Sequence, residues 1–199
     1  MTKRNCVTVS VFLVFILALS GVLCAQRVID LDKVWGDMRV LGSLAGDKIG
    51  IVFAHGDIND DGYMDILLSS YFATVAGRTS AGAAYAFLGS SSPPLTIDLS
   101  TQSADLTIYG AVANDSLGRS LASGDVNGDG YDDIIIGARH ADPGGRSSAG
   151  TTYVIFGGSL LPSLIDLNSA SANVTVYGNN PEDYCGFAVA SGNVNGDAY

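Results

Sequence analysis

The sequence repeats itself at a shift of 68 residues, and this periodicity limits the possible folds more than any other feature. The triplet Ile29-Asp30-Leu31 returns as Ile97-Asp98-Leu99 and again as Ile165-Asp166-Leu167. Other positions keep the same shift without gaps, among them Gly50, Gly118 and Gly186, and Tyr85 and Tyr153. Self-similarity at a fixed period indicates a repeat architecture. The predicted units are 29–96, 97–164 and 165–199, the last one cut short.

Each unit contains four short runs whose residues suit β-strands. In the second unit these runs are Leu106–Tyr109, Leu121–Val126, Asp133–Ala138 and Thr151–Phe156. They are rich in Ile, Val, Tyr and Thr, and turn residues separate them. No stretch keeps a helical period. Because Ile134, Ile135 and Ile136 are apolar at consecutive positions, we expect both faces of that strand to be buried.

Four strands in so long a repeat favour the blades of a β-propeller over the shorter layers of a β-solenoid. A closed propeller needs at least four blades, and 199 residues supply about two and a half. We therefore predict an all-β chain of tandem four-stranded propeller blades over residues 26–199, incomplete in itself. The end at Ala198-Tyr199 falls inside a third loop, which favours a piece of a longer protein.

Two loops in register carry oxygen side chains at positions 1, 3, 5 and 9. Alternate residues on a tightly curved loop can converge on one point, and calcium takes six to eight oxygen ligands. Gly62 and Gly130, at position 6, permit the sharp turn. The tyrosine at position 7 would contribute its backbone carbonyl. The predicted calcium ligands are Asp57, Asn59, Asp61, Tyr63 and Asp65 in the first loop, and Asp125, Asn127, Asp129, Tyr131 and Asp133 in the second.

These loops differ from the helix–loop–helix calcium site. That site requires a bidentate Glu at position 12, whereas the loops have Leu68 and Ile136 there, both in strand-like runs. The alternative is a β-hairpin turn that holds no ion, since Asn, Asp and Gly favour turns in any case. In the third loop, Asn193 replaces the first Asp and Ala198 replaces the glycine. We expect weak or absent metal binding there.

Residues 1–25 read as a secretory signal peptide. Lys3 and Arg4 precede an apolar run over Val7–Leu19, and Ala25 offers a small residue at the expected cleavage site. Cleavage after Ala18-x-Ser20 is a second option. An uncleaved membrane anchor is the main alternative, because the apolar stretch nearly reaches spanning length. We expect a secreted, extracellular or cell-surface protein, with no membrane span in the mature chain.

Removal of the leader leaves an acidic protein with one thiol. The remainder has 8 Lys and Arg against 20 Asp and Glu, a net charge of −12. An acidic surface repels nucleic acid and anionic lipid, so neither is an expected partner. Cys6 and Cys24 lie in the leader and only Cys185 remains, so no disulfide can form within the mature chain.

The loops and the strands that flank them resemble the FG-GAP repeat. The similarity includes Leu117–Asp125, Asp133–Ala138 and Ala149–Gly157. The Phe that the family has before its first Gly is Ile49, Leu117 and Cys185 here. The resemblance implies the β-propeller of integrin α chains and related surface proteins. It also implies that calcium at the ten loop positions is structural, on the propeller face opposite the usual ligand-binding face.

The predicted function is that of a calcium-stabilised extracellular module that binds a protein or glycan, as in cell adhesion. The alternative is a non-catalytic propeller attached to a secreted hydrolase whose catalytic domain lies outside this sequence. A structural spacer is a third possibility. We expect no catalysis within the chain, because His55 and His140 belong to no evident catalytic constellation. The register pair Arg78 and Arg146 is interpreted as a turn residue that bonds a carbonyl or a carboxylate.

Overall fold

The computed structural model describes residues 39–44, 46–94 and 96–193. The proposed signal peptide and most of the third loop lie outside these residues. Within them, the regular structure consists of β-strands and one 3-10 turn, η1 (Pro143–Gly145). No helix in this part of the chain is long and apolar enough to cross a membrane. The predicted all-β class is confirmed.

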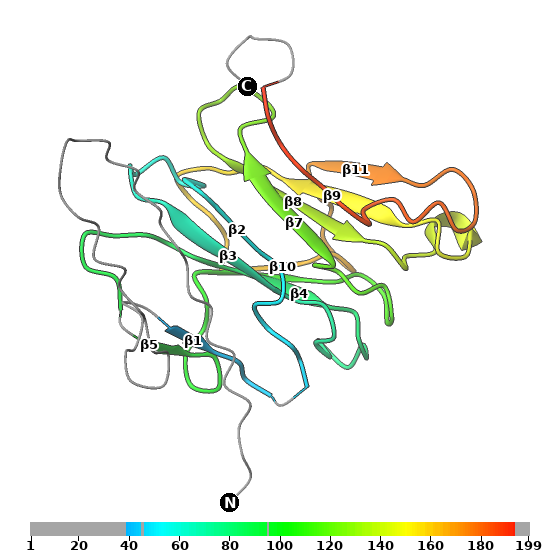
Figure 1. Ribbon diagram of the computed structural model, residues 1–199, viewed down its shortest axis with the longest axis horizontal. Helices are drawn as coiled ribbons and strands as arrows, with labels where there is room; N and C mark the ends of the chain where they lie inside the picture. Colours follow the sequence, from blue (N-terminus) through cyan, green and yellow to red (C-terminus); the bar gives the residue numbers. More distant parts are fainter. Residues whose placement is uncertain (1–38, 45, 95, 194–199) are drawn as a thin grey trace, which may run out of the picture.

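Two sheets, each built on four antiparallel strands, follow one another along the chain, and Figure 1 shows them side by side. In the first sheet, β2 (Phe53–Gly56) pairs with β3 (Asp65–Ser70), which pairs with β4 (Ala83–Phe87), which pairs with β6 (Leu106–Tyr109). In the second sheet the same order runs through β7 (Ser120–Gly124), β8 (Asp133–Ala138), β9 (Thr151–Ile155) and β11 (Val174–Tyr177). These sheets are the predicted four-stranded blades.

Short parallel pairs extend the outer edges of the blades. Strand β10 (Leu164–Asp166) adds to the outer edge of the first blade alongside β6. The pair β1 (Arg39–Leu41) and β5 (Thr96–Asp98) has the same parallel register 68 residues earlier. β1 is therefore equivalent to an outermost blade strand.

The fourth strand of each blade comes from the following sequence unit. β6 lies within residues 97–164, yet it completes the sheet that begins at β2. Self-comparison of a sequence fixes the period of a repeat but leaves its starting point free. The structural blades therefore run from β2 to β6 and from β7 to β11, and each blade interlocks two sequence units.

The main core lies where the two blades meet. Leu67 on β3 and Leu106 and Ile108 on β6 pack in one cluster with Ile134 and Ile136 on β8, all 2% exposed or less. Burying each such side chain contributes about 1.5–3 kcal/mol. Both predicted faces of β8 are buried, since Ile135 is 8% exposed. A second cluster, of Val40, Ile49, Leu68, Phe87, Ile97 and Ala104, covers the other face of the first blade.

A repeated backbone joint connects each blade to the chain segment that leads into the next. The amide of Leu117 donates to the carbonyl of Ala81 at 2.9 Å, and that of Gly110 donates to the carbonyl of Gly82 at 2.9 Å. The same bonds recur 68 residues later between Ala149 and Cys185 and between Gly150 and Gly178. Leu117 and Cys185 occupy the position of the family's Phe. Leu117 is fully buried, and Cys185 is a free thiol.

An acidic residue recurs beside these joints at Asp47, Asp115 and Asp183. Burial, and then the charge of Asp142, raises the pKa of Asp115 to about 6. Its folded pKa therefore lies above its unfolded value. The folded protein therefore holds the proton of Asp115 more tightly than the unfolded chain does. The stability that comes from the protonated side chain is fully present below about pH 4 and is lost as the pH rises through 6.

We expect Asp115→Asn to stabilise the protein at pH 7.5 by about 1–3 kcal/mol and to have little effect at pH 4. Urea denaturation in calcium-free buffer between pH 4 and 8 measures the difference between variant and wild type. Asp105→Asn, at an exposed position, is the matched control. A difference that does not change with pH would show that Asp115 is ionised at no cost in the folded protein.

Candidate metal loops

The loop between β2 and β3 folds its polar side chains inward onto its own backbone. The carboxylate of Asp57 accepts hydrogen bonds from the amides of Asp61 and Gly62, at 3.1 and 2.8 Å. Asn59 Oδ1 accepts from the Asp61 amide at 3.2 Å, and Asp61 Oδ1 accepts from Tyr63 at 2.9 Å. Positions 1, 3 and 5 therefore present their oxygens to the same small turn.

The loop between β7 and β8 repeats this arrangement. Asp125 accepts from the amides of Gly128 and Gly130, at 2.7 and 2.9 Å. Asn127 Oδ1 accepts from the Asp129 amide at 2.8 Å, and Asp129 Oδ1 accepts from Tyr131 at 3.0 Å. The amide side chains also match, since Asn59 Nδ2 and Asn127 Nδ2 donate to Asp61 and Asp129.

The aspartates at position 9 are fully buried and connect three parts of each blade. Asp65, at the start of β3, accepts from the amide of Ile58 at 2.8 Å and from that of Gly89 at 2.7 Å. Asp133 accepts from Val126 at 3.0 Å and from Gly157 at 2.9 Å. Gly89 and Gly157 follow β4 and β9. Each aspartate therefore fastens the loop to the exit of the third strand.

The glycines at position 6 are in the left-handed region, as the sequence predicts. Gly62 has φ +84° and Gly130 has φ +91°. Position 4 is also left-handed in both loops, with Asp60 at +53° and Gly128 at +80°. Because a β-carbon resists this conformation, the second loop is the less strained of the two.

The electrostatics of the loops favour a cation. Burial is the main cause of the raised pKa of Asp65, and the charges of Asp57 and Asp61 add to it. Asp133 is raised by burial in the same way, with Asp129 and Asp125 adding to the effect. The acids of each loop thus lie close enough to repel one another. A bound cation would relieve that repulsion.

The donor set matches a hard cation, because every predicted side-chain ligand offers oxygen. An oxygen that accepts one N–H bond keeps a second lone pair. In the part of the chain that the structure describes, however, no three His, Cys, Asp or Glu side chains converge in an arrangement that could hold a metal ion. As they stand, the loops are hairpins closed by their own hydrogen bonds.

One family model matches the chain twice, over residues 50–87 and 117–155, and its description is FG-GAP repeat. Each matched segment begins just before the first strand of a blade and contains one complete Asp-rich loop. The chain contains FG-GAP repeats.

Curated relatives share these FG-GAP segments. A Bos taurus phosphatidylinositol-glycan-specific phospholipase D is 32% identical over 171 residues, which cover 84% of this chain and 19% of that protein. Its Homo sapiens counterpart is 30% identical over 162 residues, covering 81% and 18%. Integrin alpha-3 of Cricetulus griseus is 32% identical over 111 residues, covering 52% and 10%. The chain thus spans about a fifth or less of the length of these relatives.

The loops of the two FG-GAP blades are joined to each other, a feature that the loop pattern does not predict. Asp132, at position 8, accepts from the amide of Asp57 at 2.9 Å and donates its own amide to the Asp57 carbonyl at 3.0 Å. Gly158 also donates to the carbonyl of Ile58 at 2.8 Å. The first ligand position of one loop is therefore fixed by the next blade.

A second link follows the repeat register along the inner strands. Ser123 Oγ donates to the carbonyl of His55 at 2.5 Å, and Ser191 Oγ donates to the carbonyl of Ser123. These three positions are 68 residues apart. His55 therefore contributes its backbone to a contact between blades. Of the third loop, only Asn193 lies within the described residues, so its metal binding stays a prediction.

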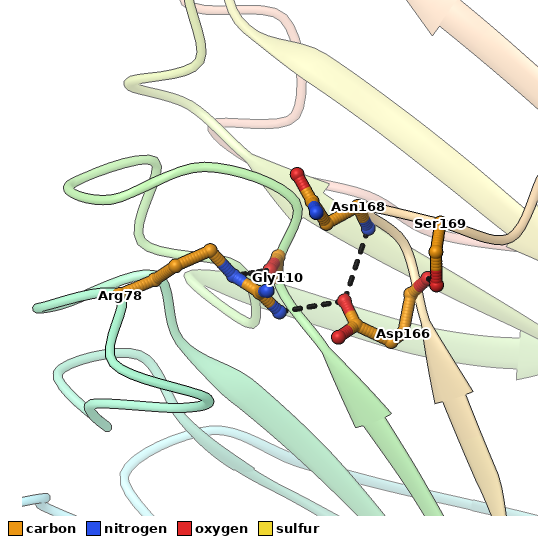
Figure 2. A network of polar contacts seen from close by, with 5 residues as sticks. All are labelled: Arg78, Gly110, Asp166, Asn168 and Ser169. Carbon is orange, nitrogen blue, oxygen red and sulfur yellow. Dashed lines mark hydrogen bonds and ion pairs between the residues drawn. The ribbon is translucent and has the colours of Figure 1, made fainter.

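The repeated arginines have the structural role that the sequence indicates. Figure 2 shows Arg78 bonded to the Gly110 carbonyl through Nε and to Asp166 through Nη2, at 3.2 and 2.6 Å. Asp166 also accepts from the amide of Asn168. Arg146 Nε makes the equivalent carbonyl bond to Gly178 at 3.1 Å. These contacts connect the turn before the third strand of a blade to its outer edge.

Proposed function

We propose that this chain is a calcium-stabilised, extracellular FG-GAP propeller module that binds a protein or glycan partner and carries out no catalysis itself. The observation that supports it most is the pair of matching loops, each with four oxygen side chains at positions 1, 3, 5 and 9. The ligands are the ten loop residues predicted from the sequence, with the carbonyls of Tyr63 and Tyr131 included. The ion would supply charge and rigidity to each hairpin.

The extracellular assignment rests on the signal peptide that the sequence predicts at residues 1–25. Extracellular calcium modules bind at about 10⁻⁴–10⁻³ M, and this is the affinity that we expect of the loops. Because the two loops bond to each other through Asp57 and Asp132, an ion in one would also support the neighbouring blade.

A second candidate is a non-catalytic propeller region of a larger hydrolase. The similarity to proteins named phosphatidylinositol-glycan-specific phospholipase D favours it. The two candidates agree on the calcium loops and differ on what the rest of the protein does. The sequence of the complete gene separates them, because further blades alone favour a binding protein and a domain without repeats favours the hydrolase.

Calcium at ten times its dissociation constant should stabilise each loop by about 1.4 kcal/mol. We expect Asp129→Ala to remove about half of the calcium-induced rise in melting temperature, because one of two sites is lost. Thermal denaturation in 5 mM calcium and in chelator measures it. Asp60→Asn, at a position that is not a ligand, is the control and should keep the full rise. An unchanged rise in Asp129→Ala would favour a turn without metal.

A further inference from the structure

A hollow of about 160 Å³ lies between the two blades and is lined by cationic and aromatic side chains. Its main residues are Lys48, Arg119, Arg139, His140, Tyr71 and Phe72. Lys48 and Arg119 precede the first strands of the two blades, and the others follow the second strands, β3 and β8. The Asp-rich loops join the opposite ends of these same strands. The hollow therefore opens on the other side of the blades from the metal loops.

The repeat explains why two arginines meet here. Arg119 lies over the ring of Tyr71, with its guanidinium carbon 4.7 Å from the ring centroid. One repeat later, Arg139 lies over Phe187 at 5.1 Å. Tyr71 and Arg139 are equivalent positions, and so are Arg119 and Phe187. In the first contact the arginine precedes the first strand of a blade and the ring follows a second strand, whereas in the next contact these positions are exchanged. As a result, both arginines face the same hollow.

Positive charge is concentrated around the hollow. Of the six Lys and Arg residues among those that the structure describes, three line the hollow, in a chain of net charge −10. None of the three forms an ion pair with a carboxylate in the described part of the chain. Lys48 instead lies over Phe72, with Nζ 4.4 Å from the ring centroid. Three like charges around one hollow, none of them in an ion pair within the described residues, favour binding of an anion.

Both guanidinium groups lie over aromatic rings. The planar fork of N–H groups on a guanidinium matches an oxyanion in a bidentate manner. His140 Nε2 accepts from Arg139 Nε at 3.0 Å, which fixes the orientation of that guanidinium. Burial, and then the charges of Arg139 and Arg119, lower the pKa of His140, and the charge of Asp142 opposes this shift in part.

We infer that this hollow binds a tetrahedral oxyanion, a phosphate or sulfate ester group carried by the partner. Three cations from separate segments suit a group with three free oxygens better than a carboxylate with two. The volume of about 160 Å³ is large enough to accommodate such a group. This inference rests on the proposed binding role of the module and gives the chemistry of its ligand.

The test is an NMR titration of the full chain in 50 mM salt with methyl phosphate, methyl sulfate and acetate, each followed through backbone amide shifts. We expect saturable shifts centred on residues 116–119 and 139–140 with one or both esters, and at least tenfold weaker binding of acetate. The stronger of the two esters identifies the source. The double variant Arg119→Gln and Arg139→Gln should weaken ester binding at least tenfold.

Arg39→Gln on β1 removes a charge of the same sign that does not line the hollow, and it should change ester affinity less than twofold. If the double variant does not fold, Lys48→Gln replaces it, with an expected loss of at least threefold. Absence of saturable shifts up to 50 mM ester, or equal weakening by Arg39→Gln, would overturn the inference. Calcium titration of the same samples is an independent measurement. It distinguishes loops that fail to bind calcium beside a hollow that binds the ester from the reverse case.

Discussion

Gly82→Ala is expected to destabilise the protein by at least about 3 kcal/mol. Gly82 has φ +84°, and a β-carbon there would lie 2.2 Å from the carbonyl oxygen of Leu117. The obstacle is backbone, which cannot rotate away as a side chain does. Since Leu117 begins the entry to the second blade, the substitution forces the blades apart.

Urea denaturation followed by circular dichroism measures this loss. Gly158→Ala is the control, because no atom lies within 4 Å of its added β-carbon, and it should cost less than about 1 kcal/mol. The equivalent change Gly150→Ala, where Cys185 O would be 2.3 Å away, should behave as Gly82→Ala does. Wild-type stability of Gly82→Ala would mean that the joint between the blades differs from the one described above.

Asp133→Ala should cost about 2–5 kcal/mol in calcium-free buffer. The substitution removes the acceptor for the amides of Val126 and Gly157, and each buried donor left without a partner costs about 1–3 kcal/mol. The effect does not depend on metal, because both bonds form within the protein. The raised pKa of Asp133 shows that burial of its charge is unfavourable, so the stabilisation comes from the two hydrogen bonds.

Asp129→Ala is the comparison for this prediction, since Asp129 is exposed and bonds within its own loop. It should cost about 1 kcal/mol or less without calcium. The same denaturation experiment in chelator distinguishes the two variants. Equal losses would indicate that the bonds of Asp133 to the amides of Val126 and Gly157 contribute nothing to stability.

The sequence alone predicts the strands and the loops because both depend on local pattern. Ile134, Ile135 and Ile136 form the buried strand that their consecutive apolar character predicts. Gly62 and Gly130 have the positive φ that their place in the loop requires. The repeat shift also indicated a structural role for Arg78, and its bonds to Gly110 and Asp166 confirm it.

Features that join one repeat to another were not predictable in the same way. The period is a property of the sequence, but the starting point of a blade depends on β6 pairing with β4, a contact across the unit boundary. Asp132 resembles any acidic turn residue until the next blade places Asp57 beside it. Arg119 and Arg139 are 20 positions apart in the sequence. They line one hollow because the cation and the ring occupy exchanged repeat positions in the two successive contacts.

The central claim is that the two Asp-rich loops of these FG-GAP blades bind calcium, and calorimetric titration of the folded chain tests it most directly. We predict two calcium ions per chain with dissociation constants of about 10⁻⁴–10⁻³ M. The double variant Asp61→Ala and Asp129→Ala should bind neither. Absence of heat at millimolar calcium, in a sample that circular dichroism shows to be folded, would contradict the account and leave the loops as hairpin turns closed by their own hydrogen bonds.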